Sequence, residues 1–249
     1  ILVRAQTPRH TYRRQRDRLH AINYGRFSHS SSLQCRFLPP ERGGAAFLLV
    51  RSWPDAAAWR QFADAPPPAV RRLLDAGGGL LAPLLFGQER VSPVDAWRQV
   101  RQDSYLATTY NRTDAMHQAD DIVTTMRLAQ VEMGIAPSRL AIVADGQMGL
   151  VALAAWAFLR SQMRLGPLAV DMGGADLEDP AVWAERAYFP LLAGAGGVRA
   201  LAGLANNGQG LVTGVPAACR RLFPRWLRVR AASAGLEALL ADADRLLRG

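Results

Sequence analysis

The sequence of 249 residues predicts an α/β protein, a three-layer α/β/α sandwich built around a mostly parallel sheet. Short apolar runs that suit strands alternate along the chain with longer segments in which apolar residues recur at helical spacing. The run Leu140–Val143 is too short and too apolar for an amphipathic helix, and it suits a strand covered on both faces. After a glycine turn, Leu150–Leu159 is rich in alanine and leucine, which predicts a helix buried almost all round.

The elements before this unit follow from strand and turn signals. Leu33–Leu38 alternates between apolar and polar residues, and the apolar run Ala45–Val50 predicts a central strand beside this edge strand. The segment Asp55–Asp75 is broken by consecutive prolines and predicts two short helices, the second of which ends at Gly77–Gly79. Leu80–Phe86 predicts a further strand.

The second half of the chain continues the alternation. Val91–Thr109 has no strong period and predicts an excursion over the sheet edge. Helical spacing predicts a helix over Asp114–Met133, with Asp114 as its cap and Gly134 as its stop. The later elements expected are the strands Leu168–Val170, Leu211–Val215 and Leu227–Val229 and the helices Pro180–Tyr188 and Leu236–Leu247. Strands and helices that alternate in this way predict a parallel sheet flanked by helices.

The length predicts one domain with a sizeable core. Residues 1–30 are polar and rich in arginine, end in a serine-rich link, and predict an N-terminal arm or linker. Residues 31–249 are expected to form the domain. The chain begins with neither an initiator Met nor a signal-peptide core, so we expect it to be a piece of a longer protein whose compartment the sequence does not give.

The chain is basic, with a net charge of +9 and a pI of about 10.8, which raises nucleic acid as a partner. Every basic residue is arginine, however, and the arginines are spread along the chain. The densest cluster is Arg13, Arg14, Arg16 and Arg18, which suits a solvated arm. This usage is typical of a GC-rich bacterial genome, and we expect no nucleic-acid partner.

The sequence indicates no metal, cofactor or membrane span. Cys35 and Cys219 lack the spacing of a metal site or a redox motif. No apolar run reaches the length needed to cross a bilayer.

Residues 140–149 match the strand, sharp turn and helix by which some enzymes expose a nucleophile. Gly146 takes the nucleophile's place. Ala144 and Gly149 satisfy the demand for small residues where strand and helix pass closely, and Met148 violates it. Gly146 has no atom that can attack a carbonyl, but glycine is the residue best suited to a positive-φ tip.

A catalytic triad would also need a base and an acid. The histidines are His10, His20, His29 and His117, whereas the base of such a site would follow the last strand, near Ala231–Gly235. Asp171 and Asp176 are candidate acids, but an acid with neither base nor nucleophile performs no acyl transfer. Both aspartates also suit ordinary loop and helix-capping roles.

Other interpretations of the turn stay open. Asp145 as a carboxylate nucleophile would shift the turn by one residue, place Gln147 where a small residue is required, and still lack a histidine. The backbone N–H groups of Gln147 and Met148 are expected to point outward at a helix N-terminus, as a candidate anion or oxyanion site.

The same residues also fit a dinucleotide site. Ala144, Gly146 and Gly149 match A-x-G-x-x-G between a strand and a helix, and Asp171 follows at the spacing of a ribose-binding acid. Against this interpretation, the first glycine of the fingerprint is an alanine, and the unit comes after other strands instead of opening its domain.

The order of elements over residues 31–249 resembles the α/β-hydrolase superfamily. An edge strand, the strand Ala45–Val50, a helix, a strand ending in Leu84–Gly87, a long helix, the glycine turn and two late strands follow one another. The likeness is to large bacterial acetyl-xylan-esterase-like and dienelactone-hydrolase-like proteins. Thr109–Arg112 and Tyr188–Ala205 are similar to segments that precede the turn helix and a late strand in those proteins.

This resemblance implies a carboxylic-ester hydrolase, but the sequence departs from the active pattern. Gly146 replaces the serine, the final histidine is absent, no acid follows Leu211–Val215, and Arg51–Pro54 stands where a His-Gly oxyanion segment is expected. Some such proteins resemble a tandem of two hydrolase-like domains, and this chain is similar to the degenerate second one, with glycine at its elbow.

From the resemblance we expect a non-catalytic domain that supports an adjacent hydrolase domain of the same longer protein. The resemblance is also compatible with an exported protein. The alternatives are an active carboxylic-ester hydrolase with a non-standard site and a nucleotide-binding oxidoreductase module.

Overall fold

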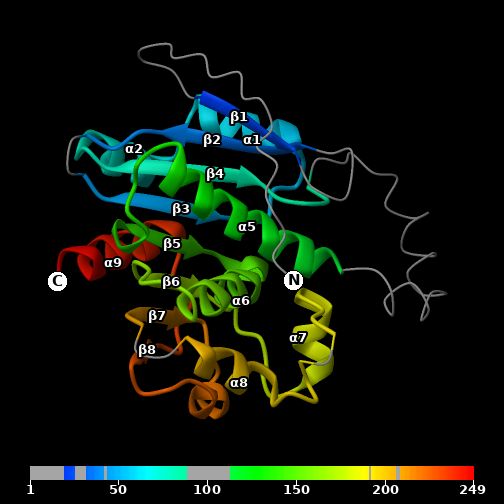
Figure 1. The fold of residues 1–249 in the computed structure, drawn as a ribbon. Coiled ribbons are helices and arrows are strands. Elements are labelled where there is room, and N and C mark those ends of the chain that lie inside the picture. The colour runs from blue at the N-terminus through cyan, green and yellow to red at the C-terminus, as the bar shows by residue number, and fades with distance from the viewer. Residues whose placement is uncertain (1–19, 26–31, 42–43, 89–112, 191, 206–207) are drawn as a thin grey trace.

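One mixed sheet forms the centre of the molecule. The computed structural model describes residues 20–25, 32–41, 44–88, 113–190, 192–205 and 208–249. Within these residues eight strands follow the order β1-β2-β4-β3-β5-β6-β7-β8 (Figure 1). They are β1 (His20–Gly25), β2 (Ser32–Leu38), β3 (Ala46–Val50), β4 (Gly79–Leu84), β5 (Leu140–Ala144), β6 (Leu168–Asp171), β7 (Gly210–Thr213) and β8 (Leu227–Val229).

Strand β2 pairs antiparallel with β1 and β4, and the pairs from β4 through β8 are parallel. Parallel neighbours need long crossovers, which helices supply. The helices are α1 (Ala56–Asp64), α2 (Pro68–Asp75), α5 (Asp114–Val131), α6 (Gly149–Arg160), α7 (Pro180–Arg186), α8 (Gly197–Leu204) and α9 (Leu236–Arg248). Three short 3₁₀ turns are η1 (Pro137–Arg139), η2 (Gly146–Met148) and η3 (Ala217–Leu222).

Helices cover both faces of the sheet, which confirms the predicted three layers. Along β3, Leu48 and Val50 point into an apolar core shared with α5, α6 and α8. Phe47 and Leu49 point into a second core shared with α1, α2 and α9. Successive side chains of a strand face opposite ways, so the buried runs of β3, β4 and β5 supply both cores.

Helix α6 is buried on nearly every side, as its sequence predicts. It packs between α5 and α8 on one face of the sheet (Figure 1). Trp156 is fully buried, and its indole Nε1 donates to the backbone oxygen of Gly166 at 3.1 Å. The polar atom of this large side chain is therefore satisfied inside the core.

Some expectations were wrong in detail. Strand β1 lies within the segment 1–30 that was expected to be an arm, because backbone pairing with β2 recruits it to the sheet edge. Helix α8 forms within Tyr188–Ala205, where no helix was expected, and Val198, Leu201 and Ala202 give it a buried face. The cap of α5 is Thr113, whose Oγ1 accepts from Met116 N at 3.3 Å, and not Asp114.

The excursion expected over Val91–Thr109, the arginine cluster at residues 13–18 and the segment Thr109–Arg112 lie outside the described residues.

The glycines of α6 and α8 allow a matched test of helix-to-strand packing. A Cβ added at Gly149 would lie 2.3 Å from the backbone oxygen of Asp171, whereas one at Gly203 would meet nothing within 4 Å. We expect Gly149→Ala to lower the free energy of unfolding by about 2 kcal/mol or more, because backbone must move. Gly203→Ala should raise it by about 0.5 kcal/mol. Urea denaturation of both variants measures the difference, and equal effects would contradict the close approach.

Candidate functional site

The candidate site lies at the carboxyl edge of the sheet, where β5 passes into α6. The chain leaves β5 extended at Asp145, reverses at Gly146, and forms the single turn η2 before α6 begins. Gly146 has φ +56, in the left-handed region that favours glycine. A Cβ added at Gly146 would meet nothing within 4 Å. The turn therefore has the backbone shape expected of a nucleophile turn. The space at its tip is open, because glycine carries no side chain there.

The helix that follows approaches β6 closely. A Cβ at Gly149 would collide with the backbone oxygen of Asp171 and lie 3.2 Å from the sulfur of Met172. The need for a small residue at this position therefore has a steric cause. Met148, which violates the small-residue pattern, is 4% exposed and packs into the core shared with α5 and α6.

Asp145 is engaged in an ion pair. Its Oδ2 lies 2.9 Å from Nε of Arg51, the residue that follows β3. The Arg51 Nε–H does not meet hydrogen-bond geometry, so this contact is an ion pair without a hydrogen bond from Nε. The guanidinium also stands over the ring of Trp53, 5.4 Å from its centroid. Burial raises the pKa of the Asp145 carboxyl; the charge of Arg51 acts against this rise and that of Asp171 adds to it.

Asp171 is 4% exposed, and its carboxylate accepts hydrogen bonds from two loops and from the last residue of β7. Its Oδ1 accepts from Gly173 N at 2.6 Å. Its Oδ2 accepts from Thr213 Oγ1 at 2.7 Å and from Ala234 N at 2.6 Å. The carboxylate therefore ties together the ends of β6 and β7 and the loop after β8. We call these four residues the Asp171 knot.

The loop after β8 occupies the place where a catalytic base was expected. Arg230 O and Ala232 O accept from Val215 N and Gly214 N at 3.2 and 3.1 Å, which holds this loop against the end of β7. A Cβ at Gly214 would lie 2.8 Å from both Asp171 Oδ1 and Ser233 Oγ. A serine hydroxyl thus stands near the acid where a histidine would be needed, and the sequence has no histidine after His117.

Arg186, the last residue of α7, contacts the loop after β6. Arg186 Nη1 donates to Met172 O at 2.9 Å. A Cβ at Gly173 would lie 2.9 Å from this Nη1 and 3.6 Å from Gly146 Cα. The guanidinium therefore sits beside the tip. Sequence reasoning noted Arg51 only as a departure from a pattern, and it missed Arg186 because no local signal connects α7 to the turn.

The predicted anion site is wrong for Met148. Its backbone N–H donates to Asp145 O at 3.2 Å, because the chain tightens into a 3₁₀ turn before α6 begins. Gln147 lies exposed at the turn. Asp176, the other candidate acid, accepts from Glu178 N at 3.0 Å and from the Cys219 thiol at 3.3 Å, as a loop carboxylate does.

Among the described residues, no group of three or more histidine, cysteine, aspartate or glutamate side chains could hold a metal ion. In the same part of the chain, no helix is both long and apolar enough to cross a membrane.

Solved structures superpose on most of this chain at low sequence identity. The 2,6-dihydroxy-pseudo-oxynicotine hydrolase has a TM-score of 0.56 and 15% identity, over 92% of this chain and 67% of that one. MPT51 (FbpC1) of Mycobacterium tuberculosis has a TM-score of 0.57 and 15% identity, over 92% and 99%. A CE15 glucuronoyl esterase from Teredinibacter turnerae has a TM-score of 0.55 and 13% identity, over 92% and 72%.

The chain has the α/β-hydrolase fold. At these identities the likeness establishes the hydrolase fold alone, and any activity must be argued from the site. No model of a protein family matches the sequence, and a search of curated proteins gives no match.

The Asp171 knot should be a main source of stability at this edge. Asp171→Ala leaves three donors without their acceptor, and we expect the free energy of unfolding to fall by about 3 kcal/mol. Asp179→Ala removes only the exposed carboxylate that accepts from Ala181 N at 2.9 Å, and should cost about 1 kcal/mol. Chemical denaturation compares the two variants. Equal losses would show that the knot contributes no more than an ordinary helix cap.

The pKa of Asp145 gives a pH test with a definite sign. A carboxyl whose folded-state pKa lies above its ordinary value of 3.8 binds its proton more tightly in the folded state. The free energy of unfolding of the wild type, minus that of Asp145→Asn, should therefore fall as the pH rises from 3.8 through the raised pKa. Urea denaturation across this range measures it. A difference that grows with pH would mean that the Arg51 pair outweighs burial.

Proposed function

We propose that this chain is a non-catalytic α/β-hydrolase-fold domain that supports an adjacent esterase-like domain of a longer protein. Gly146 carries the proposal. It stands at the tip of the turn with φ +56, and a side chain there would have open space, yet glycine offers no nucleophilic atom. The turn keeps the shape of an elbow without its chemistry.

The surroundings of the turn support the same conclusion. The Asp171 carboxylate accepts from Gly173, Thr213 and Ala234, so a catalytic role would require it to give up bonds that join two loops to the end of β7. The loop after β8 contains Ser233 and no histidine. A triad needs a base between nucleophile and acid, and no residue of this loop can act as one near neutral pH.

Asp145 as an alternative nucleophile receives no support from its contacts. Its carboxylate lies against the guanidinium of Arg51, which lowers the charge density available for attack on a carbonyl. The dinucleotide alternative meets a similar obstacle, because Asp171 would have to reach a ribose while it is buried and bound to three internal donors. In chain order, β5 also follows the strands β1 to β4, whereas the fingerprint strand normally opens its domain.

The proposed supporting role rests on the resemblance to tandem hydrolase-like proteins whose second domain carries glycine at the elbow. A glucuronoyl esterase is among the structures with this fold. The reading frame upstream of Ile1 tests this part of the proposal by itself. We expect it to encode a second hydrolase-like unit with an intact serine and histidine, and an unrelated upstream sequence would remove the basis for the partner.

The catalytic part of the proposal is tested with p-nitrophenyl acetate. We expect no turnover above the buffer rate for the wild type or for Gly146→Ser, because a new hydroxyl still lacks a base. Gly146→Ser and its control Gly146→Ala should each lose about 1–2 kcal/mol of stability, since both place a side chain in the left-handed region. Denaturation of both variants checks that they fold.

Two outcomes would overturn the non-catalytic assignment. Turnover by the wild type that Asp145→Asn abolishes would favour an active hydrolase with a non-standard site. A rise in melting temperature on addition of NAD would favour the nucleotide-binding alternative.

A further inference from the structure

Two large apolar side chains project from the face of the molecule that α6 and α8 cover. Phe158, in the last turn of α6, is 52% exposed, and Leu204, the last residue of α8, is 60% exposed. Each helix leads into a parallel strand, β6 or β7, so its carboxyl end lies at the amino edge of the sheet (Figure 1). Both side chains therefore lie at the amino edge, whereas the Gly146 turn lies at the carboxyl edge.

The fully buried Trp156 of α6 brings three other segments of the chain to this place. Its Nε1 donates to Gly166 O at 3.1 Å. A Cβ added at Gly208 would lie 2.3 Å from its Cη2, and its ring centroid is 6.1 Å from that of Trp226. We define the amino-edge patch as four exposed residues that lie within four positions of these contacts along the chain: Phe158, Arg164, Leu204 and Arg225.

The amino-edge patch carries positive charge. Residues 146–170 and 186–236, the two stretches that contain its members, have no aspartate or glutamate. Arg164 and Arg225 are exposed, and neither forms an ion pair with the part of the chain that the structure describes. Arg160, in the last turn of α6, donates from Nη1 to Leu165 O at 3.3 Å. The sign of the patch therefore rests on Arg164 and Arg225.

Neighbouring elements leave this charge in place. Helix α5 packs against α6 and brings Arg127 and Glu132 near its end, one charge of each sign. The carbonyl ends of α6 and α8 contribute about half a negative charge each, which together is less than the charge of the two arginines.

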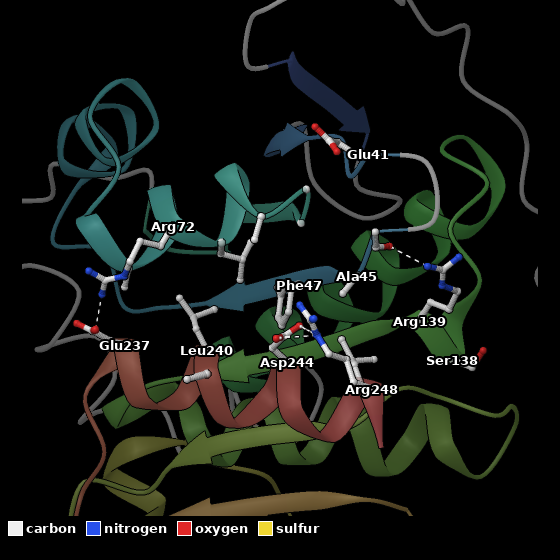
Figure 2. A pocket seen from close by; sticks show the side chains of 18 residues that line it. Glu41, Ala45, Phe47, Arg72, Ser138, Arg139, Glu237, Leu240, Asp244 and Arg248 are labelled. Atoms are coloured by element: carbon white, nitrogen blue, oxygen red, sulfur yellow. Dashed lines mark hydrogen bonds and ion pairs between the residues drawn. The ribbon is translucent and has the colours of Figure 1, made fainter.

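The other face of the sheet is balanced in charge at this edge. A groove of about 640 Å³ lies there between α2 and α9 (Figure 2). Its ion pairs join Arg72 to Glu237 and Arg248 to Asp244. Its remaining charged residues are one glutamate and one arginine, Glu41 and Arg139. The excess positive charge therefore belongs to the face that α6 and α8 cover.

We propose that the amino-edge patch docks on an anionic lipid surface, with Phe158 and Leu204 inserted among the lipids and Arg164 and Arg225 at the head groups. Side chains that are more than half exposed project from a surface, as insertion requires. A guanidinium matches a lipid phosphate in shape and charge. An anionic leaflet presents one sign of charge, which fits segments that hold arginine and no carboxylate. A second copy of this chain would instead bring arginine against arginine.

Co-sedimentation of the 249-residue chain with vesicles tests the docking. Vesicles of equal parts phosphatidylglycerol and phosphatidylcholine present an anionic surface, and vesicles of phosphatidylcholine alone are the neutral control. At about 0.1 M salt we expect partition into the anionic vesicles to be at least about tenfold stronger. Equal partition into both overturns the proposal. Partition into neither also overturns it and would favour an acidic protein surface as the occupant.

The charge of the patch is tested by a double variant, Arg164→Gln with Arg225→Gln. It should weaken partition into anionic vesicles by at least about tenfold, because each arginine near such a surface adds attraction. Arg60→Gln with Arg71→Gln removes the same charge from α1 and α2, which cover the other face, and should retain wild-type partition. Equal losses in the two double variants would mean attraction by net charge alone and would overturn the assignment to the patch.

Insertion is tested by Phe158→Ala with Leu204→Ala, which should weaken partition into anionic vesicles by at least about tenfold. Tyr188→Ala is the control, because Tyr188 is 46% exposed and its backbone oxygen accepts from Thr113 Oγ1 at the carboxyl edge, where α5 begins. Denaturation midpoints like that of the wild type show that each variant is folded. Wild-type partition by the Phe158 and Leu204 variant overturns the proposal. The measurement involves no catalysis, so its outcome is separate from the test of the proposed function.

Discussion

The buried carboxylate of Asp171 is the interaction on which the carboxyl edge of this sheet depends. It receives hydrogen bonds from the loops that follow β6 and β8 and from Thr213 at the end of β7, and its own backbone oxygen lies where a side chain at position 149 would stand. A carboxylate removed from water needs such partners, because an unsatisfied buried charge is strongly destabilising. The same residue therefore fixes the loops and forces α6 to begin with glycine.

Under the proposed non-catalytic role, this arrangement explains how a hydrolase fold can keep its form without a triad. In an active site, a carboxylate orients a histidine, and the histidine activates a hydroxyl. Here the acceptor positions of Asp171 are used by Thr213 and by backbone N–H groups, and a serine stands in the neighbouring loop. Arg51 pairs with Asp145, and Arg186 donates to Met172 O in the loop after β6. The hydrogen bonds of the acid hold loops together instead of orienting a base.

The two edges of the sheet differ in how they use small residues. At the carboxyl edge, Gly149 lets backbone approach backbone, and no space is left. At the amino edge, Ala69 of α2 and Ala241 of α9 line an open groove, and Arg72 and Glu237 from the same two helices form an ion pair there. The open groove therefore lies at the opposite edge of the sheet from the glycine turn.

The sequence by itself determined the layers, the order of most elements and the glycine at the tip of the turn, because these depend on local periodicity and on the conformational range of single residues. It also showed that no histidine follows His117, since an absent residue type needs no coordinates. It did not give β1 or α8, whose formation depends on pairing and burial against distant segments. The partners of Asp145 and Asp171, the position of Arg186 beside Gly146 and the groove between α2 and α9 were decided only by tertiary structure. Thr213 and Asp171 are 42 positions apart in the chain, and Arg72 and Glu237 are 165 positions apart. Contacts over such separations produce no periodic pattern in the sequence.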